Sequence, residues 1–126
     1  EIEAFIAGVP DSGDLAKMKS VVLESVVTTR ECGDWLMEQG AQNMRAVAAG
    51  STPFLRLFSM TLGAYLLVKG AVKAEEMLAA GSGDGEFLRR KISVASFFVH
   101  QLLPQAIALA PAIRATDEPL FEVELA

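Results

Sequence analysis

The hydrophobic pattern is densest in the middle of the chain. Across residues 57–68 there is no charge, and apolar side chains occur all round the helical wheel rather than along one stripe. Charge returns at Lys69, Lys73 and Glu76, so only the C-terminal half of this stretch has a hydrophilic face. A helix that is apolar on all sides is normally buried on all sides. The pattern therefore predicts that residues 51–78 form the central helix of a bundle, with Phe58 and Leu62 at its centre.

The expected start of this helix is Ser51-Thr52-Pro53. The Thr52 hydroxyl can accept a hydrogen bond from a backbone N–H of the first turn, and Pro53 suits the first helical position because its missing N–H is not needed there. The twelve uncharged residues at 57–68 are fewer than the roughly twenty that a membrane-spanning helix needs. We therefore expect a buried helix and no membrane partner.

Small residues inside the central helix need a physical reason, because Gly63 and Gly70 each cost about 1 kcal/mol relative to alanine in a helix interior. Together with Ser59 and Ala74 they lie close to one line along the helix. Such a line predicts the close approach of a neighbouring helix backbone. The alternative is that the glycines are tolerated without a packing role.

Two further long helices are expected, one before and one after the central helix. Residues 14–39 place side chains for the buried face at three- and four-residue spacing, and Gly40 ends the pattern; the expected buried positions are Leu15, Met18, Val22, Val26, Thr29, Gly33 and Leu36. Residues 85–115 have the same periodicity, and Phe87, Leu88 and Ile92 begin the expected apolar face. Within this last helix, Pro104 removes one backbone hydrogen bond and predicts a kink, after which the helix continues.

Less regular segments lie between and beyond these helices. Residues 1–8 have the pattern of the last turns of a helix, and without an initial Met the chain is expected to be part of a longer protein. So short a helix must dock against the bundle or a second copy, because isolated helices need about 12–15 residues. Residues 42–49 predict a short helical turn, and the acidic residues 116–126 predict a loose tail. The expected fold class is all-α, with one domain at residues 1–115: an antiparallel up-and-down bundle of three long helices plus a short N-terminal helical segment.

Composition agrees with a packed helical domain. Of the 126 residues 52% are hydrophobic, and the net charge of −5 disfavours nucleic acid and anionic membranes as partners. The single cysteine, Cys32, excludes an internal disulfide, and with His100 as the only histidine it cannot build a Cys/His zinc site. The lone cysteine and the lack of a signal-like segment predict a cytoplasmic location.

His100, Cys32 and the glycine-rich loop 81–85 are the first candidates for a functional site. His100 could act as a base or a phosphate carrier, but no spacing brings a nucleophile or carboxylate to it, so a structural role is favoured. Cys32 has no neighbouring cation and is expected to be a small buried hydrophobe. The glycine-rich loop 81–85 lacks the preceding strand and the following Lys-Ser/Thr of a phosphate-binding loop. It also lacks the acid spacing of a calcium loop, so we expect a helix connector.

Charged residues offer three further candidates. The basic cluster at 89–91 could meet a phosphate, although three neighbours spread over most of a helix circumference and its second arginine can pair with Glu86. Arg56 lies among apolar residues and is expected to be buried with an acidic partner. Glu75 and Glu76 are adjacent and do not share a helix face, which favours solvated carboxylates over a metal or acid–base site. No residue is predicted to be catalytic, cofactor-binding or metal-binding.

Two long motifs carry a resemblance to a known family. They are STPFLRLFSMTLGAYLLVKGA at 51–71 and FLRRKISVASFFVHQLLPQA at 87–106, joined through the glycine-rich loop. With the amphipathic helix from Leu15, they resemble the C-terminal helical extension of the acyl-CoA dehydrogenases, in the branch typified by methylthiopropanoyl-CoA dehydrogenase. The resemblance covers about residues 1–115.

The resemblance implies a parent enzyme that binds FAD and oxidises an acyl-CoA thioester to the 2,3-enoyl-CoA. It also implies that the flavin-binding domains and the catalytic glutamate lie outside this chain, so no cofactor is expected in the fragment itself. The expected partner is the remainder of the parent enzyme, with a homo-oligomer as a further option and acyl-CoA as the substrate of the parent. The expected function is a non-catalytic domain that makes quaternary contacts or shapes the acyl-CoA entrance. The alternative is a free-standing helical interaction or oligomerisation module.

Overall fold

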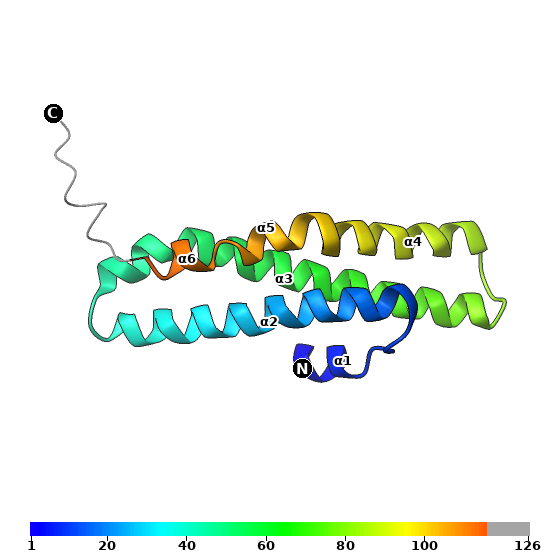
Figure 1. The fold of residues 1–126 in the computed structure, drawn as a ribbon, viewed down its shortest axis with the longest axis horizontal. Helices are drawn as coiled ribbons and strands as arrows, with labels where there is room; N and C mark the ends of the chain where they lie inside the picture. The colour runs from blue at the N-terminus through cyan, green and yellow to red at the C-terminus, as the bar shows by residue number, and fades with distance from the viewer. Residues whose placement is uncertain (116–126) are drawn as a thin grey trace, which may run out of the picture.

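Helix α3 (Met44–Ala79) runs the length of the molecule and contacts the other two long helices (Figure 1). In the computed structural model, which describes residues 1–115, α2 (Gly13–Gly40) and α4 (Gly85–Phe97) each pack against α3 and run antiparallel to it. No strand is present in the described residues. The predicted all-α bundle is confirmed, and the predicted tail at 116–126 lies outside the part of the chain that the structure describes.

The helix that starts with α4 changes its geometry before Pro104. It passes into a π-helical turn, η1 (Phe98–Leu102), and then into the short helices α5 (Leu103–Ile107) and α6 (Ala110–Ile113). Because proline has no N–H, the α-helical hydrogen bond to the His100 carbonyl cannot form. A π turn shifts the hydrogen bonds to a wider spacing at this point. The chain thus stays helical beyond the proline as predicted, by way of a π turn that the sequence pattern does not indicate.

Helix α3 begins well before the predicted start. Asn43 caps it, since the side-chain oxygen of Asn43 accepts hydrogen bonds from the backbone N–H groups of Arg45 (3.1 Å) and Ala46 (3.4 Å). Pro53 therefore lies inside the helix rather than at its first position. The predictions of a start at Pro53 and of a separate helical turn at 42–49 are wrong.

Gly50 gives the physical reason for this continuous helix. It is buried, and a Cβ atom placed on it would lie 2.7 Å from the backbone oxygen of Ile113 and 3.0 Å from Cδ2 of Leu36. The backbone of α6 and a side chain of α2 therefore approach so closely that only glycine fits. Tertiary packing overrides weak local helix propensity at this position.

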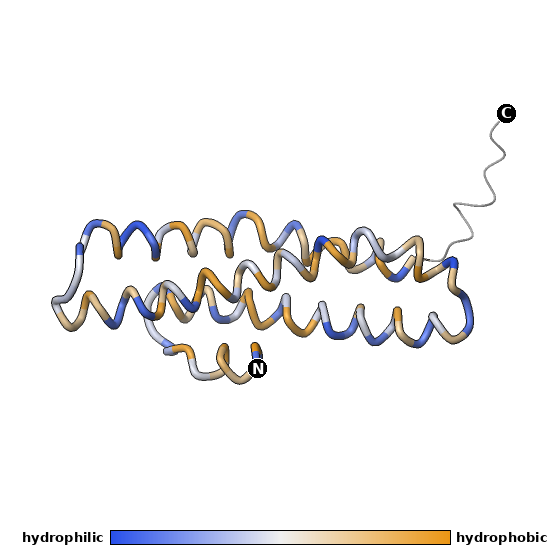
Figure 2. The backbone as a smooth tube through the Cα atoms, turned by 180° about the vertical axis from the view of Figure 1, so that it is seen from behind, coloured by the Kyte–Doolittle hydropathy of each residue, from blue (hydrophilic) through white to orange (hydrophobic). Residues whose placement is uncertain are grey.

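Helix α2 is amphipathic, as its periodicity predicts. One side is buried against the bundle, and hydrophilic residues recur along its C-terminal half (Figure 2). The buried set differs slightly from the predicted one, because Ser25 and Cys32 are buried where Val26 and Gly33 were the expected positions. The buried residues of α2 are Leu15, Met18, Val22, Ser25, Thr29, Cys32 and Leu36.

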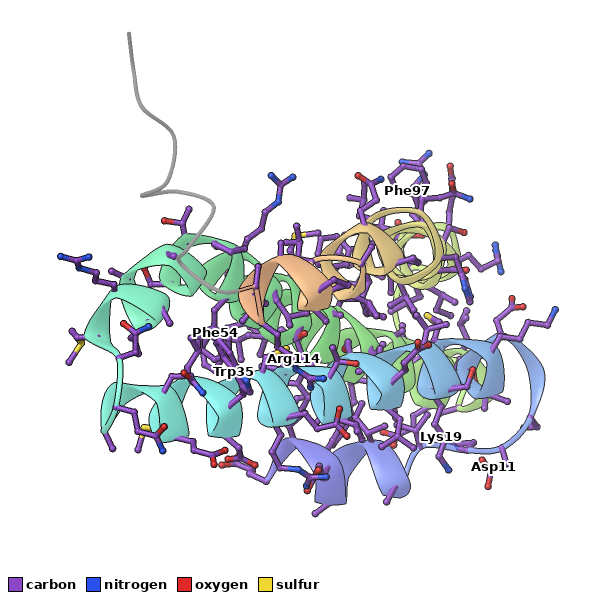
Figure 3. All side chains as sticks on the ribbon, turned by 60° about the vertical axis from the view of Figure 1, so that its left-hand side comes forward. Asp11, Lys19, Trp35, Phe54, Phe97 and Arg114 are labelled. Carbon is purple, nitrogen blue, oxygen red and sulfur yellow. The ribbon has the colours of Figure 1, made fainter. Side chains whose placement is uncertain are left out.

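Two clusters of buried side chains form the core. The larger joins α1, α2 and α3 to α4, η1 and α5, and includes Ile6, Met18, Val22, Val68, Ala95, Val99 and Leu103. The second lies at the other end of the bundle and consists of Cys32, Leu36, Leu57, Ala106 and Ile113. Figure 3 shows Trp35, Phe54 and Arg114 near this second cluster.

A buried hydroxyl pair links α2 to α3. The Thr29 hydroxyl donates a hydrogen bond to the backbone oxygen of Ser25 (2.7 Å), and its oxygen lies 3.0 Å from the Thr61 hydroxyl. Since the single proton of Thr29 is used on Ser25, Thr61 is the donor to Thr29. Both threonines are buried and hydrogen-bonded, so this polar contact does not leave an unsatisfied group in the core.

Helix α1 (Ile2–Ala7) packs on the bundle as a short fourth element (Figure 1). The Phe5 ring meets the Tyr65 ring edge-on, with centroids 5.4 Å apart. Lys19 of α2 holds the turn that follows α1. Its ammonium donates to the backbone oxygens of Ala7 and Val9 and pairs with the Asp11 carboxylate at 2.7 Å. Of the two predicted options for this segment, docking on the bundle is the one observed.

Candidate docking face

One side of α3 is apolar and exposed. Leu55, Phe58, Leu62 and Leu66 follow one another at three- and four-residue spacing, and their exposed fractions range from 38% to 66%. We call these four residues the outer stripe. The prediction that residues 57–68 are buried on all sides, with Phe58 and Leu62 at the centre of the bundle, is therefore wrong. The physical reason is that its neighbours in this bundle leave the outer side of α3 open.

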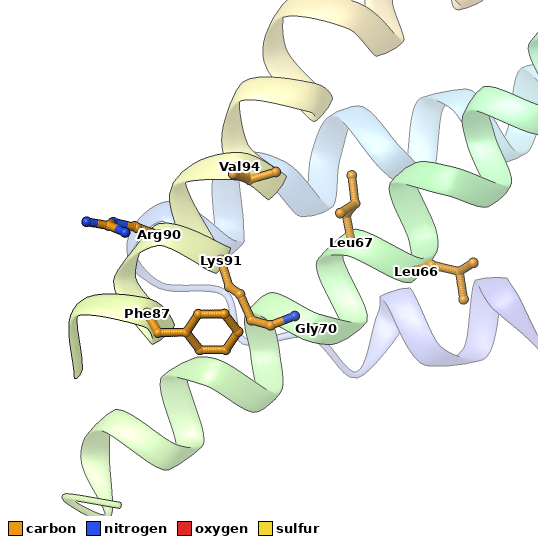
Figure 4. A pocket seen from close by; sticks show the side chains of 7 residues that line it. All are labelled: Leu66, Leu67, Gly70, Phe87, Arg90, Lys91 and Val94. Atoms are coloured by element: carbon orange, nitrogen blue, oxygen red, sulfur yellow. The ribbon is translucent and has the colours of Figure 1, made fainter. Parts of the chain in front are cut away.

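A groove lies between α3 and α4, and Leu66 of the outer stripe forms part of its α3 wall (Figure 4). It has a volume of about 390 Å³, and its walls are Leu66, Leu67 and Gly70 from α3 and Phe87, Arg90, Lys91 and Val94 from α4. In Figure 4 the Phe87 and Lys91 side chains point toward α3, whereas Arg90 points outward. Phe87 and Val94 are more than half exposed, although Phe87 was expected on the buried face of its helix.

The groove continues toward the loop that joins α3 to α4. A second hollow of about 240 Å³ shares Gly70, Phe87 and Lys91 with the first and extends to Met77 and Asp84. We call the two together the α3–α4 groove. From Leu66 to Met77 its α3 wall is about 16 Å long, since each helical residue rises about 1.5 Å.

The small residues of α3 do not form the predicted helix crossing. A Cβ atom at Gly70 would meet no atom within 4 Å, so Gly70 opens onto the groove. A Cβ atom at Gly63 would touch the Phe98 ring at 3.4 Å, which is an ordinary side-chain contact. The close backbone approach expected at these glycines occurs at Gly50 instead.

Lys91 faces the groove, which Arg90 and Lys73 also line. Its ammonium lies 5.5 Å from the centroid of the Phe87 ring, and it forms no ion pair with any residue in the described range 1–115. The neighbouring Arg90 instead pairs with Glu86 on its own helix, as predicted. Within the basic cluster, Arg90 thus forms an ion pair on its own helix, whereas the Lys91 ammonium lies over the apolar Phe87 ring.

The other candidate residues lie apart from this groove. Arg56 is exposed, and no ion pair joins it to another described residue, so the prediction of a buried arginine with an acidic partner is wrong. Cys32 is fully buried as predicted, and burial raises the pKa of its thiol despite the opposing charge of Arg114. His100 is half-buried in η1, and Glu76 pairs with Lys73 at 3.1 Å. Within the described residues, no group of three or more His, Cys, Asp and Glu side chains could hold a metal ion.

Two helical stretches of the described chain are long and apolar enough to cross a membrane by length and composition alone. They are Met44–Ala79 and Gly85–Ile113. The core helix of a globular bundle meets the same criterion, and α3 has a buried side that packs on both α2 and α4. Length and composition of these helices therefore do not by themselves assign the chain to a membrane.

Comparison with known proteins connects this bundle to an enzyme family. Residues 1–124 match the family model described as acetyl-CoA dehydrogenase C-terminal like. The chain belongs to this family of acyl-CoA dehydrogenase C-terminal domains. A curated relative, 3-methylmercaptopropionyl-CoA dehydrogenase from Ruegeria pomeroyi, is 36% identical over 92 residues, which make up 73% of this chain and 16% of that enzyme.

These matches confirm the resemblance that the motifs indicate. Within this family domain, the motif at 51–71 lies in α3, whereas the motif at 87–106 runs through α4, η1 and most of α5. The two motifs therefore supply both walls of the first hollow of the α3–α4 groove. The chain spans about a sixth of the relative's length, so most of the related enzyme has no counterpart here.

Proposed function

We propose that this chain is a non-catalytic helical domain of an FAD-dependent acyl-CoA dehydrogenase. The parent enzyme would oxidise an acyl-CoA thioester to the 2,3-enoyl-CoA, and this domain would bind the remainder of the enzyme. The contact would lie between subunits or beside the acyl-CoA entrance. The family match over residues 1–124 supports the parent, and a cytoplasmic location is part of the same proposal.

The observation that carries this proposal is the exposed apolar face formed by α3 and α4. Leu66 of the outer stripe lines the groove together with Phe87 and Val94, and Phe97 follows Val94 by three residues, so it is a neighbour on the same helix surface. Monomeric proteins rarely expose contiguous apolar patches larger than a few hundred Å², and larger ones usually mark an interaction surface. A binding role therefore fits this face better than a catalytic one.

A free-standing interaction module would also expose such a face. The matched region of the curated relative is only 16% of that enzyme, so in this relative the domain accompanies a much larger protein. This arrangement favours a domain attached to a catalytic body over a module that acts by itself.

Expression of the complete reading frame tests the proposed function. The full-length product should retain FAD and reduce an electron acceptor in the presence of an acyl-CoA, whereas residues 1–126 alone should do neither. Flavin retained by the isolated chain through gel filtration would overturn the non-catalytic assignment. A full-length product without flavin or acyl-CoA oxidation would favour the free-standing module.

Removal of residues 1–126 from the active enzyme separates the two binding roles. Loss of the native oligomer in sedimentation, with an unchanged KM for acyl-CoA, would indicate quaternary contacts. An intact oligomer with an altered KM would indicate a role at the acyl-CoA entrance.

A further inference from the structure

The α3–α4 groove has the form of a helix-binding site. It is open along its length and spans about three helical turns of α3, and apolar side chains from both helices line it, with charged residues beside them. An amphipathic helix binds such a groove with apolar side chains at positions i, i+3 or i+4, and i+7. The groove adjoins the outer stripe, so a helix seated in it could extend its contact across α3.

Gly70 leaves open space in the groove. A glycine within a helix costs about 1 kcal/mol relative to alanine, and no neighbour in the described residues requires its small size, since a Cβ atom there would meet nothing within 4 Å. A bound helix would supply the missing reason, because it could bring its side chains close to the α3 backbone at this position.

Lys91 is the groove cation that lacks an ion pair within residues 1–115, whereas Arg90 pairs with Glu86 and Lys73 with Glu76. Its ammonium points toward the apolar groove (Figure 4) and has no carboxylate partner within residues 1–115. Covering an unpaired ammonium with apolar groups removes its hydration and is strongly unfavourable. A helix that covers the groove therefore needs an Asp or Glu side chain opposite Lys91.

We propose that the α3–α4 groove binds an amphipathic helix from the catalytic part of the same enzyme, with apolar side chains over Leu66, Gly70 and Phe87 and a carboxylate on Lys91. This inference rests on the proposed function. The related dehydrogenase supports the source of the helix, since 84% of its length lies outside the matched region (100% − 16%). A helix rather than a lipid chain is favoured because the exposed apolar surface extends beyond the groove to Phe58 and Leu55.

Cysteine labelling in the full-length enzyme tests whether the groove is covered. Gly70→Cys and Val94→Cys place a thiol in the groove, and Lys17→Cys places one on an exposed site of α2 as a matched control. The native Cys32 is fully buried and should react slowly. A maleimide is added to the native enzyme, and the labelled peptide is quantified by mass spectrometry against the denatured enzyme.

The groove thiols should react about tenfold or more slowly than the control thiol, because reaction requires the bound helix to open. This protection should not change over a hundredfold range of enzyme concentration. Equal rates at all three sites would overturn the proposal. Protection that grows with concentration would assign the groove to a second copy, and protection seen only with anionic phospholipid vesicles would assign it to a membrane, so either result also overturns it.

Charge reversal tests the carboxylate. Lys91→Glu in the Val94→Cys enzyme should raise the labelling rate about fivefold or more, since it replaces an attraction by a repulsion. Lys17→Glu makes the same change in net charge away from the groove and should leave the rate unchanged. An unchanged rate in the Lys91→Glu enzyme would overturn the acidic character of the helix. Acyl-CoA oxidation measured on the same samples separates the proposed function from the proposed helix in the groove. An enzyme that oxidises acyl-CoA while its groove thiols react as fast as the control thiol contradicts only the helix in the groove.

Discussion

The inner and outer sides of α3 have similar hydrophobicity and different environments. Leu57 is fully buried between α2 and the α5–α6 region, whereas Leu66 on the outer stripe is 56% exposed. Both belong to the same uncharged run, and hydropathy alone does not distinguish them. The comparison shows that an all-round apolar helix can use one side to form its own fold and leave the other side exposed.

The largest contrast is expected between leucine truncations on the two sides. Leu57→Ala should lower the free energy of unfolding of the chain by about 2–5 kcal/mol, because it leaves a cavity in a closed cluster. Leu66→Ala should cost about 0.5 kcal/mol or less, as for other exposed sites. Urea titration followed by circular dichroism measures both. Similar losses from the two variants would mean that the sides are assigned incorrectly.

Glycine substitutions should change stability in opposite directions. Gly50→Ala should destabilise the chain by about 1–3 kcal/mol, because its new Cβ atom clashes with the Ile113 backbone. Gly70→Ala should stabilise the isolated chain by about 0.5–1 kcal/mol, since alanine favours helix and has open space there. Thermal unfolding of the two variants gives the signs directly. A stabilising Gly50→Ala would contradict the close approach of α6.

The threonine pair between α2 and α3 should respond unequally. Thr29→Val removes the acceptor of the Thr61 hydroxyl and should cost about 1–3 kcal/mol, the range for an unsatisfied buried group. Thr61→Val leaves Thr29 bonded to Ser25 and should cost about 1 kcal/mol or less. Denaturant unfolding of both single variants and the double variant measures the coupling. Equal costs would show that Thr61 finds another acceptor.

The smallest effect is expected at the charged end of the outer side. Lys73 pairs with Glu76 at 3.1 Å, and both side chains are more than 60% exposed. Such surface pairs contribute about 0–1 kcal/mol, so Lys73→Ala should be close to silent in chemical denaturation. A loss comparable to that of Leu57→Ala would indicate a structural role that the geometry does not show.

The order and type of the long helices could be predicted because their periodicity and their glycine or proline boundaries agree. The start of α3 could not be predicted, because a glycine such as Gly50 usually marks the end of a helix. Only the structure shows that Gly50 lies inside α3 and is needed there for the close approach of the Ile113 backbone. The resemblance to acyl-CoA dehydrogenases was available from the motifs at 51–71 and 87–106. The position of the exposed apolar face on α3 and α4 could not be predicted, because burial against another protein and burial within the same chain give the same hydrophobic pattern. Gly70, which opens onto this face, was assigned to a helix crossing within the chain.

Sedimentation of the 126-residue chain tests most directly whether the outer stripe is a binding surface. The average mass of the unmodified chain should rise over a hundredfold range of concentration, because exposed apolar patches associate when their partner is missing. Leu66→Lys should be monomeric over that range, with a free energy of unfolding within about 0.5 kcal/mol of the parent chain. A parent chain that is monomeric throughout, or a Leu66→Lys variant as unstable as Leu57→Ala, would contradict the account.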